Sequence, residues 1–174
     1  MGPALTRTLH IVVMGVAGCG KSTVAEMLGD EFDLRLAEGD SFHPPVNIAK
    51  MSSGQPLTDD DRWPWLEALA RWTGECQGAG QSTVVTCSAL KRAYRDVLRG
   101  PVPHTLFLHL YGDEELLLRR MEVRDHFMPA SLLRSQFEIL EELQPDERGV
   151  AVDVGMSVHQ LARQVIEVVR PHVG

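Results

Sequence analysis

The segment that most constrains this chain is residues 15–22, Gly-Val-Ala-Gly-Cys-Gly-Lys-Ser, which match the pattern G-x-x-x-x-G-K-[ST] at every fixed position. An apolar run at residues 10–14 precedes it, and apolar side chains at helical spacing follow it as far as Phe32. Glycines let such a turn point its backbone N–H groups inward, where they and the positive end of the next helix attract phosphate oxygens. The pattern therefore predicts a strand, a phosphate-binding loop and a helix in succession.

The same pattern assigns roles to individual side chains. The Lys21 ammonium is expected to reach the β- and γ-phosphates of a nucleoside triphosphate and to assist catalysis. The Ser22 hydroxyl is expected to bind the accompanying Mg²⁺. The residues expected to surround the phosphates are Gly15, Val16, Ala17, Gly18, Cys19, Gly20, Lys21, Ser22 and Thr23. The alternative is a glycine-rich turn without a ligand, and the flanking strand and helix favour the nucleotide.

The rest of the chain alternates short apolar runs with segments of helical period, which is typical of βα units and a parallel sheet. We predict one domain over residues 1–174 with a three-layer α/β fold, a central parallel five-stranded sheet and helices on both faces. Residues 41–57 show no clear period, Thr58 and Asp61 form a capping-box-like helix start, and 132–143 are expected to be helical. The expected strands are 10–14, 34–37, 83–87, 105–110 and 150–152.

Two classes of nucleotide-binding protein do not fit. A GTPase needs an Asn-Lys-x-Asp segment to read guanine, and the only asparagine, Asn47, is followed by isoleucine. A motor ATPase usually has a later strand ending in Asp or Asp-Glu, whereas the third expected strand ends at Cys87 and Ser88. A small-molecule kinase fits better, with a substrate-binding segment at about 40–66 and a short lid at about 120–131.

Composition limits the partners. The net charge of -7, without a basic block, argues against nucleic acid or an anionic membrane as a partner. No apolar stretch approaches the roughly 18 residues of a membrane helix. Three widely spaced cysteines do not form a disulfide or zinc pattern, which favours a reducing, cytoplasmic location.

Asp40 follows the second expected strand, at the sheet edge where open α/β sheets bind ligands. A carboxylate there can accept the proton of an attacking hydroxyl or hold Mg²⁺ through water. An aspartate that merely opens a turn is the alternative. Asp40 is therefore a candidate catalytic and substrate-binding residue.

Four ordered segments decide between these interpretations, because together they resemble the gluconokinase family of P-loop sugar-acid kinases over about residues 8–170. The first has the G-D-x-x-H-P-x-x-N-x-x-K-M signature, the second G-x-P-L-x-D-x-D-R-x-P-W-L and the third C-S-A-L-K-x-x-Y-R-D. The fourth contains His-Phe-Met-Pro and Ser-Gln-Phe-Glu, resembling that family's lid and the helix after it. The segments are residues 38–51, 54–66, 87–96 and 126–141.

The resemblance implies a P-loop kinase fold, the ATP-dependent phosphorylation of D-gluconate to 6-phospho-D-gluconate with Mg²⁺, and a homodimer. Gluconate is an anion with many hydroxyls, so its pocket needs a cation and several polar groups. The candidates are Asp40, His43, Asn47, Ser88, Lys50, Lys91 and Arg95. Spacing does not say which of Lys50, Lys91 and Arg95 meets the carboxylate; His43 can instead brace a turn.

Arg120 and Arg124 match arginines that flank the family's lid, and a closing arginine can stabilise the transferring phosphoryl group. Two positions depart from the family: the segment from Arg124 to Phe127 lacks a glycine before the histidine and is one residue shorter, and Glu38 stands where an aspartate is common. The alternatives are a kinase of another small hydroxy acid, such as shikimate, and a nucleotide-binding regulatory module without catalysis.

Overall fold

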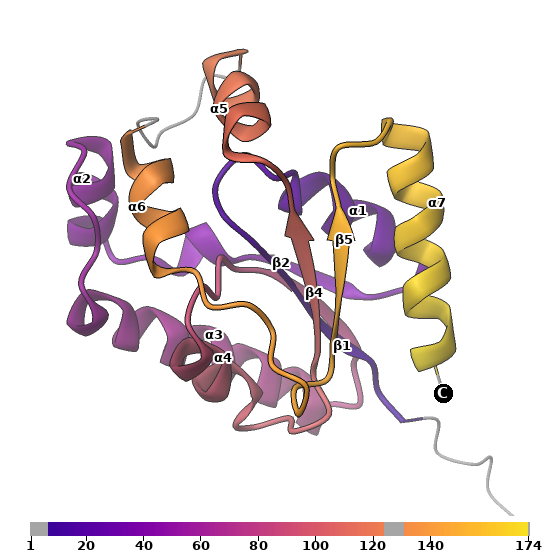
Figure 1. Ribbon diagram of the computed structural model, residues 1–174. Helices are drawn as coiled ribbons and strands as arrows, with labels where there is room; N and C mark the ends of the chain where they lie inside the picture. The colour runs from indigo at the N-terminus through magenta and orange to yellow at the C-terminus, as the bar shows by residue number, and fades with distance from the viewer. Residues whose placement is uncertain (1–6, 124–130, 174) are drawn as a thin grey trace, which may run out of the picture.

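The computed structural model describes residues 7–123 and 131–173. At its centre, five parallel strands lie in the order β2-β3-β1-β4-β5 (Figure 1). This confirms the expected parallel five-stranded sheet, and each strand begins and ends within one residue of its expected bounds. The strands are β1 (His10–Met14), β2 (Arg35–Glu38), β3 (Thr83–Thr86), β4 (Leu106–Tyr111) and β5 (Gly149–Asp153).

Helices cover both faces of the sheet, which completes the expected three layers (Figure 1). On one face α1 (Lys21–Phe32) packs beside α7 (Val158–Val169), and on the other α3 (Asp59–Gly78) packs beside α4 (Arg92–Arg99). All of β1 is buried between these layers, because it pairs with β3 on one side and β4 on the other. A strand covered on both faces needs a continuous apolar run, and this run is why the sequence predicted β1 correctly.

The remaining short helices gather at the edge toward which the strands point (Figure 1). They are the 3₁₀ helix η1 (Gly39–Phe42), α2 (Pro45–Ser52), α5 (Glu114–Val123) and α6 (Ser131–Ile139); a further 3₁₀ turn, η2 (Arg170–His172), follows α7. Most of the expected lid falls between α5 and α6, where residues 124–130 lie outside the described residues.

Two helical elements differ from expectation. Residues 45–52 form α2, which the proline-rich composition of 41–57 concealed; Pro45 occupies the first turn, where proline costs no hydrogen bond. Helix α6 ends at Ile139, short of residue 143, because the chain beyond it forms hydrogen bonds with residues distant in sequence. The Glu141 N–H donates to the Leu90 carbonyl at 2.7 Å, and the Glu141 carboxylate accepts from the Arg92 N–H at 2.8 Å.

The expected start of α3 is confirmed. The Thr58 hydroxyl accepts from the Asp61 N–H, and the Asp61 carboxylate accepts from the Thr58 N–H at 2.9 Å, which is a reciprocal capping box. This cap fixes where the helix begins, and so which α3 side chains face the sheet edge. Among the described residues, none of the helices is long and apolar enough to cross a membrane.

Candidate functional site

The phosphate loop adopts the conformation its glycines permit. Gly20 has φ 92°, a region that L side chains rarely adopt, and forms the N-cap of α1 without a side-chain cap. The N-terminal N–H groups of α1 are therefore not capped by Gly20, as an anion site requires. The Lys21 ammonium donates to the carbonyls of Gly15 and Val16 at 3.0 and 3.1 Å, which holds it over the loop.

Ser22 meets a second group of oxygens at the end of β2. Its hydroxyl donates to the Glu38 carboxylate at 3.0 Å, and the Thr86 hydroxyl donates to the same Glu38 oxygen at 2.7 Å. Hydroxyl and carboxylate oxygens are the ligands that Mg²⁺ prefers. The glutamate that departs from the family pattern thus reaches the serine expected to bind Mg²⁺.

A close approach of backbones positions Asp40. A Cβ at Gly39 would lie 1.9 Å from the Thr86 carbonyl oxygen, so only glycine fits there. The Gly39 N–H donates to the Thr86 hydroxyl at 3.0 Å, and its carbonyl accepts from the Trp65 indole at 2.8 Å. These contacts hold the 3₁₀ turn against β3, and Asp40 projects from that turn with 62% of its side chain exposed.

His43 is buried and neutral beside Asp40. Its ring stacks on Trp65 with centroids 3.9 Å apart. Burial, and secondly the charge of Arg62, lower the His43 pKa from 6.5 to about 4. The Asn47 amide nitrogen donates to the Asp61 carbonyl at 3.0 Å and lies 3.2 Å from His43 Nδ1. Nδ1 therefore accepts, and Nε2, 3.9 Å from Asp40 Oδ1, carries the proton.

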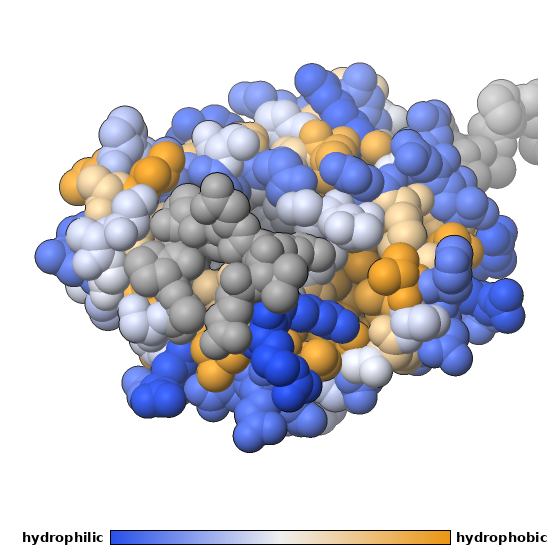
Figure 2. Space-filling view, turned by 90° about the horizontal axis from the view of Figure 1, so that it is seen from above, coloured by the Kyte–Doolittle hydropathy of each residue, from blue (hydrophilic) through white to orange (hydrophobic). Residues whose placement is uncertain are grey.

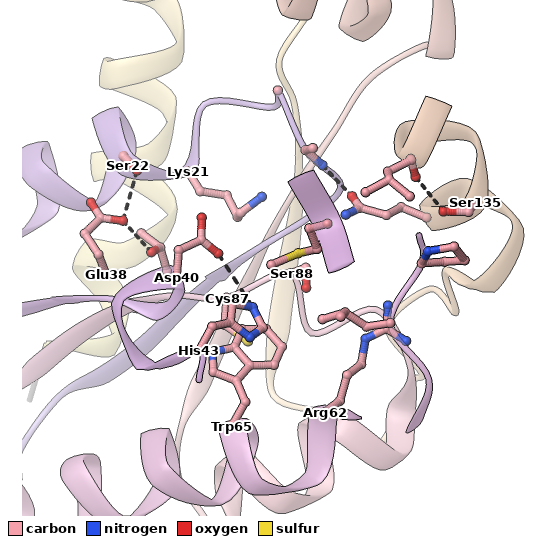
Figure 3. A pocket seen from close by; sticks show the side chains of 18 of the residues that line it. Lys21, Ser22, Glu38, Asp40, His43, Arg62, Trp65, Cys87, Ser88 and Ser135 are labelled. Carbon is pink, nitrogen blue, oxygen red and sulfur yellow. Dashed lines mark hydrogen bonds and ion pairs between the residues drawn. The ribbon is translucent and has the colours of Figure 1, made fainter. Parts of the chain in front are cut away.

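These groups line one cavity at the carboxyl edge of the sheet (Figure 3). Figure 3 shows Lys21 and Ser22 on one side, Asp40 and His43 between, and Arg62 and Trp65 rising from α3. Helix α6 contributes a further wall. The polar lining side chains are Lys21, Ser22, Glu38, Asp40, His43, Arg62, Thr86, Ser88, Ser135 and Gln136.

Gln136 links α6 to the phosphate loop. Its side-chain oxygen accepts from the Ala17 N–H at 2.7 Å in a buried contact between residues far apart in sequence. That N–H belongs to the loop expected to bind phosphate oxygens. A bound nucleotide would therefore meet the Gln136 side chain at this point.

A second, more apolar hollow adjoins the phosphate loop on the side of α7. Figure 2, which looks onto the carboxyl edge of the sheet, shows apolar surface there beside the grey residues. It lies between α1, α5 and α7, and Thr23 contributes a polar group from α1. Its residues are Gly18, Cys19, Gly20, Thr23, Val24, Met27, Leu116, Arg119, Arg120, Met156, Val158 and Leu161.

Known proteins resemble this chain in both sequence and fold. Over 143 residues the chain is 49% identical to a gluconokinase of Gluconobacter oxydans, covering 82% of this chain and 80% of that protein. The chain belongs to the gluconokinase family. The structure of a gluconokinase from Sinorhizobium meliloti is 45% identical, with a TM-score of 0.87, and covers 97% of this chain and 95% of its own. A sugar kinase from a Janibacter species is 52% identical, with a TM-score of 0.89, over 96% and 98% of the two chains.

No family model matches the chain. A shikimate kinase from Aquifex aeolicus, 13% identical with a TM-score of 0.58, shares the fold alone. The P-loop kinase fold is therefore common to both enzyme classes. Membership of the gluconokinase family is shown by the sequence identity and not by the fold.

The structure brings together some of the residues expected at the gluconokinase site. Lys21, Ser22, Asp40, His43 and Ser88 all line the first cavity. The Ser88 carbonyl also accepts from the Gly15 N–H at 3.2 Å, tying the third strand's end to the phosphate loop.

The two expected substrate lysines are paired with acids. Lys50 donates to Asp61 at 2.8 Å and is not among the described residues that line the cavity. Lys91 lies 3.2 Å from Asp59 in an adjoining hollow, and their hydrogen bond raises the Lys91 pKa. Asn47, 1% exposed, acts on the site through His43.

Arg95 is the expected substrate residue that the geometry places furthest from that role. It is completely buried and forms an ion pair with Glu147 at 2.8 Å. Its other donors meet the carbonyls of Ala89 at 2.9 Å and Glu142 at 3.2 Å. Ala89 has a left-handed φ of 46°, which the Arg95 hydrogen bond helps to fix. Arg95 thus braces the backbone that carries Ser88, and we do not retain it as a substrate ligand.

The two expected lid arginines fall in different places. Arg120 donates to the Val154 carbonyl at 2.7 Å and lines the second hollow with Arg119. Its side chain therefore faces the second hollow and, among the described residues, does not line the first cavity. Arg124 lies outside the described residues.

Sequence reasoning missed Arg62 and Gln136 as site residues. A signal existed for both, because each polar side chain falls on the apolar face of its helix. Arg62 lies four residues before the buried Leu66 of α3, and Gln136 lies three residues after the buried Leu133 of α6. A polar residue on a buried face needs a buried partner or a ligand.

Proposed function

We propose that the chain transfers the γ-phosphoryl group of ATP to the 6-hydroxyl of D-gluconate, giving 6-phospho-D-gluconate and ADP. The observation that carries the proposal is the first cavity, where Lys21 of the phosphate loop and the Asp40 carboxylate face the same space. Membership of the gluconokinase family supports the choice of substrate.

Asp40 is the proposed base. It accepts the proton of the 6-hydroxyl as that oxygen bonds to the γ-phosphorus and the bond to ADP breaks. Lys21 stabilises the charge on the transferring oxygens. His43 Nε2–H, fixed in direction by Asn47 and Trp65, is an uncharged donor for a substrate hydroxyl beside Asp40. This arrangement orients the acceptor without adding a second charge at the base.

Mg²⁺ is proposed to bind with ATP at Ser22, whose hydroxyl bond to Glu38 marks an oxygen-rich position next to the loop. Glu38 and Thr86 would orient the hydrated ion. When bound, Mg²⁺ supplies charge neutralisation for the β- and γ-phosphates.

The second hollow suits the nucleoside of ATP. It begins at Gly18 and Gly20 of the loop and continues over apolar side chains of α1, α5 and α7. A nucleobase is a flat, mostly apolar group that such a surface can cover. We propose Arg119 and Arg120, at its rim, as partners of the nucleotide's polar groups.

The test measures ADP release with D-gluconate, shikimate and other sugar acids, with Mg²⁺ and after its removal by EDTA. Activity should be far highest on gluconate and should require Mg²⁺. Asp40→Asn should lower kcat by about 10²–10⁴-fold with the Kd of ATP preserved. The matched control is Asp30→Asn, an exposed acid on α1, which should behave as wild type.

Each contrary result identifies an alternative. Highest activity on shikimate would show a different acid kinase. ATP binding without turnover on any acid would show a regulatory module. Near-normal turnover of Asp40→Asn would remove Asp40 from the mechanism.

We further propose a cytoplasmic location and, from the family resemblance, a homodimer. The three cysteines are free and buried, and burial raises the Cys87 pKa to about 12. Such a thiol stays protonated and packs as a small apolar group. Light scattering of the purified chain measures the oligomeric state.

A further inference from the structure

We propose that Arg62 binds the substrate's carboxylate and so determines that the site accepts a sugar acid rather than a neutral polyol. The inference rests on the proposed function and adds to it the group that recognises the anion. It is carried by the burial of Arg62, by its partners and by its place in the cavity.

Arg62 is a buried cation with little local compensation. It is 8% exposed, yet its guanidinium donates to the Tyr94 hydroxyl at 3.0 Å as its one hydrogen bond among the described residues. Its carbon lies 5.3 Å from the centre of the Tyr94 ring. A guanidinium has five N–H donors, and burying its charge is costly without an anion. Within residues 7–123 and 131–173, no carboxylate forms an ion pair with it.

The Tyr94 hydroxyl explains how this arrangement persists. It donates its proton to Asp59, so its oxygen is left to accept from Arg62. Asp59 in turn pairs with Lys91. The chain of contacts holds the guanidinium from behind and leaves its other donors toward the cavity.

The other candidate cations are already paired. Lys50 lies 2.8 Å from Asp61, Lys91 3.2 Å from Asp59, and Arg95 2.8 Å from Glu147. His43 is neutral near pH 7, because burial and the Arg62 charge lower its pKa to about 4. Apart from Lys21 of the phosphate loop, Arg62 is the one permanently charged cation that lines the first cavity among the described residues.

The position of Arg62 matches a linear acid that is phosphorylated at its far end. In Figure 3 its side chain rises from α3 across the cavity from Ser22 and Glu38, with Asp40 and His43 between. A carboxylate held by the planar fork of a guanidinium is fixed in orientation as well as position. The hydroxyl chain would then run past His43 toward Asp40.

The discriminating substrate pair is D-gluconate and D-gluconamide. The amide keeps the length and every hydroxyl, including the one phosphorylated, and replaces one carboxylate oxygen and the negative charge by a neutral NH2 group. A hydrogen bond to a charged group is worth about 10- to 150-fold in affinity. The wild-type ratio of kcat/KM for gluconate over gluconamide should therefore lie in that range.

Arg62→Gln should bring this ratio to within about threefold of one, mainly by raising the KM for gluconate. Arg62→Lys should keep part of the preference, because charge remains while the fork is lost. Lys50→Gln is the matched comparison and should retain the wild-type ratio, because Lys50 pairs with Asp61 and takes no part in the contacts that hold Arg62. Circular dichroism checks that each variant is folded, and if Arg62→Gln is not, the KM of Arg62→Lys decides.

A wild-type ratio in Arg62→Gln, or an unchanged gluconate KM in Arg62→Lys, would overturn the inference while the proposed function stands. Loss of the preference in Lys50→Gln alone would assign the carboxylate to that lysine instead. A wild-type protein that phosphorylates neither compound would overturn the proposed function, and this inference with it.

Discussion

Replacing Glu147 by glutamine should destabilise the fold strongly and only at a pH where the glutamate is ionised. The Glu147 side chain is fully buried and accepts from Arg95 Nε at 2.8 Å, from Arg95 Nη2 at 3.1 Å and from the Gln144 N–H at 2.8 Å. Arg99 also donates to it. The variant would keep the shape of the side chain and leave the charge of Arg95 buried without its anion.

The pKa of Glu147 gives the magnitude. Burial alone would raise the pKa, but the hydrogen bonds from Arg95, the Gln144 N–H and Arg99 outweigh it and lower the pKa from 4.5 to about 2. At 1.36 kcal/mol per pH unit this shift corresponds to about 3 kcal/mol of stability. Removing one partner of a buried ion pair typically costs about 3–5 kcal/mol. The two values agree, and in a chain of this length they imply a fall in Tm of about 6–20 °C.

The pH dependence follows from the sign of the shift. Because the folded pKa lies below the unfolded one, the contribution is complete above pH 4.5 and disappears as the pH falls toward 2. Urea unfolding of wild type and Glu147→Gln at pH 7 and pH 3 should show a large difference in unfolding free energy at pH 7 and a smaller one at pH 3. The double variant Arg95→Met/Glu147→Leu should recover part of the loss, since no charge stays buried.

Three results would refute this reasoning. A loss below about 1 kcal/mol at pH 7 would mean that the ion pair is solvated. An equal loss at both pH values would mean that the carboxylate charge is not the cause. Normal stability of Arg95→Met with a raised KM for gluconate would return Arg95 to the substrate-binding set.

Two further predictions concern the cavity. Because the folded pKa of His43 is lowered to about 4, about 3 kcal/mol of unfolding free energy should be fully present above pH 6.5 and be lost as the pH falls toward 4. Urea unfolding of wild type and His43→Phe across that range measures this loss, and a difference between the two that does not change with pH would contradict it. Gln136→Glu would place a negative charge 2.7 Å from the Ala17 N–H, so it should weaken a non-hydrolysable ATP analogue about tenfold or more and ADP, which lacks the γ-phosphate, much less. Calorimetric titration with both nucleotides checks this, and equal weakening of the two would show that Gln136 does not meet the γ-phosphate.

The elements that sequence predicted well are those whose local pattern has one interpretation. The β1 run is apolar because both faces of the sheet are covered, and the glycines of residues 15–22 are required by the loop's backbone conformation. The Thr58 cap needs only residues three apart. By contrast, α2 is short and begins with proline, so composition argued for a loop. The end of α6 depends on Leu90, a contact across the fold that no local pattern records.

The sequence indicated which segment lies at the candidate site, but not which of its charged side chains line the cavity. Residues 38–66 do supply several of the side chains that line it, but the sequence places five acids there beside Lys50, Arg62 and His43 and does not say which of them pair. Lys50 and Lys91 were expected to face the substrate, and in the structure they form ion pairs with Asp61 and Asp59. Arg62, the residue directly after Asp61, lines the cavity and forms no ion pair within the described residues.

A cavity that binds a sugar acid beside ATP must bring the substrate hydroxyl to the γ-phosphate and keep the substrate carboxylate away from it. At an effective dielectric constant near 20, two unit negative charges about 4 Å apart repel by about 4 kcal/mol, and two about 8 Å apart by about 2 kcal/mol. Cations at separate ends of the cavity therefore serve better than a cluster. Lys21 and Arg62 are arranged in this way, with neutral His43 between them. A charged histidine there would draw the carboxylate toward Asp40 and compete with the hydroxyl, so burying His43 keeps the substrate in the reactive direction.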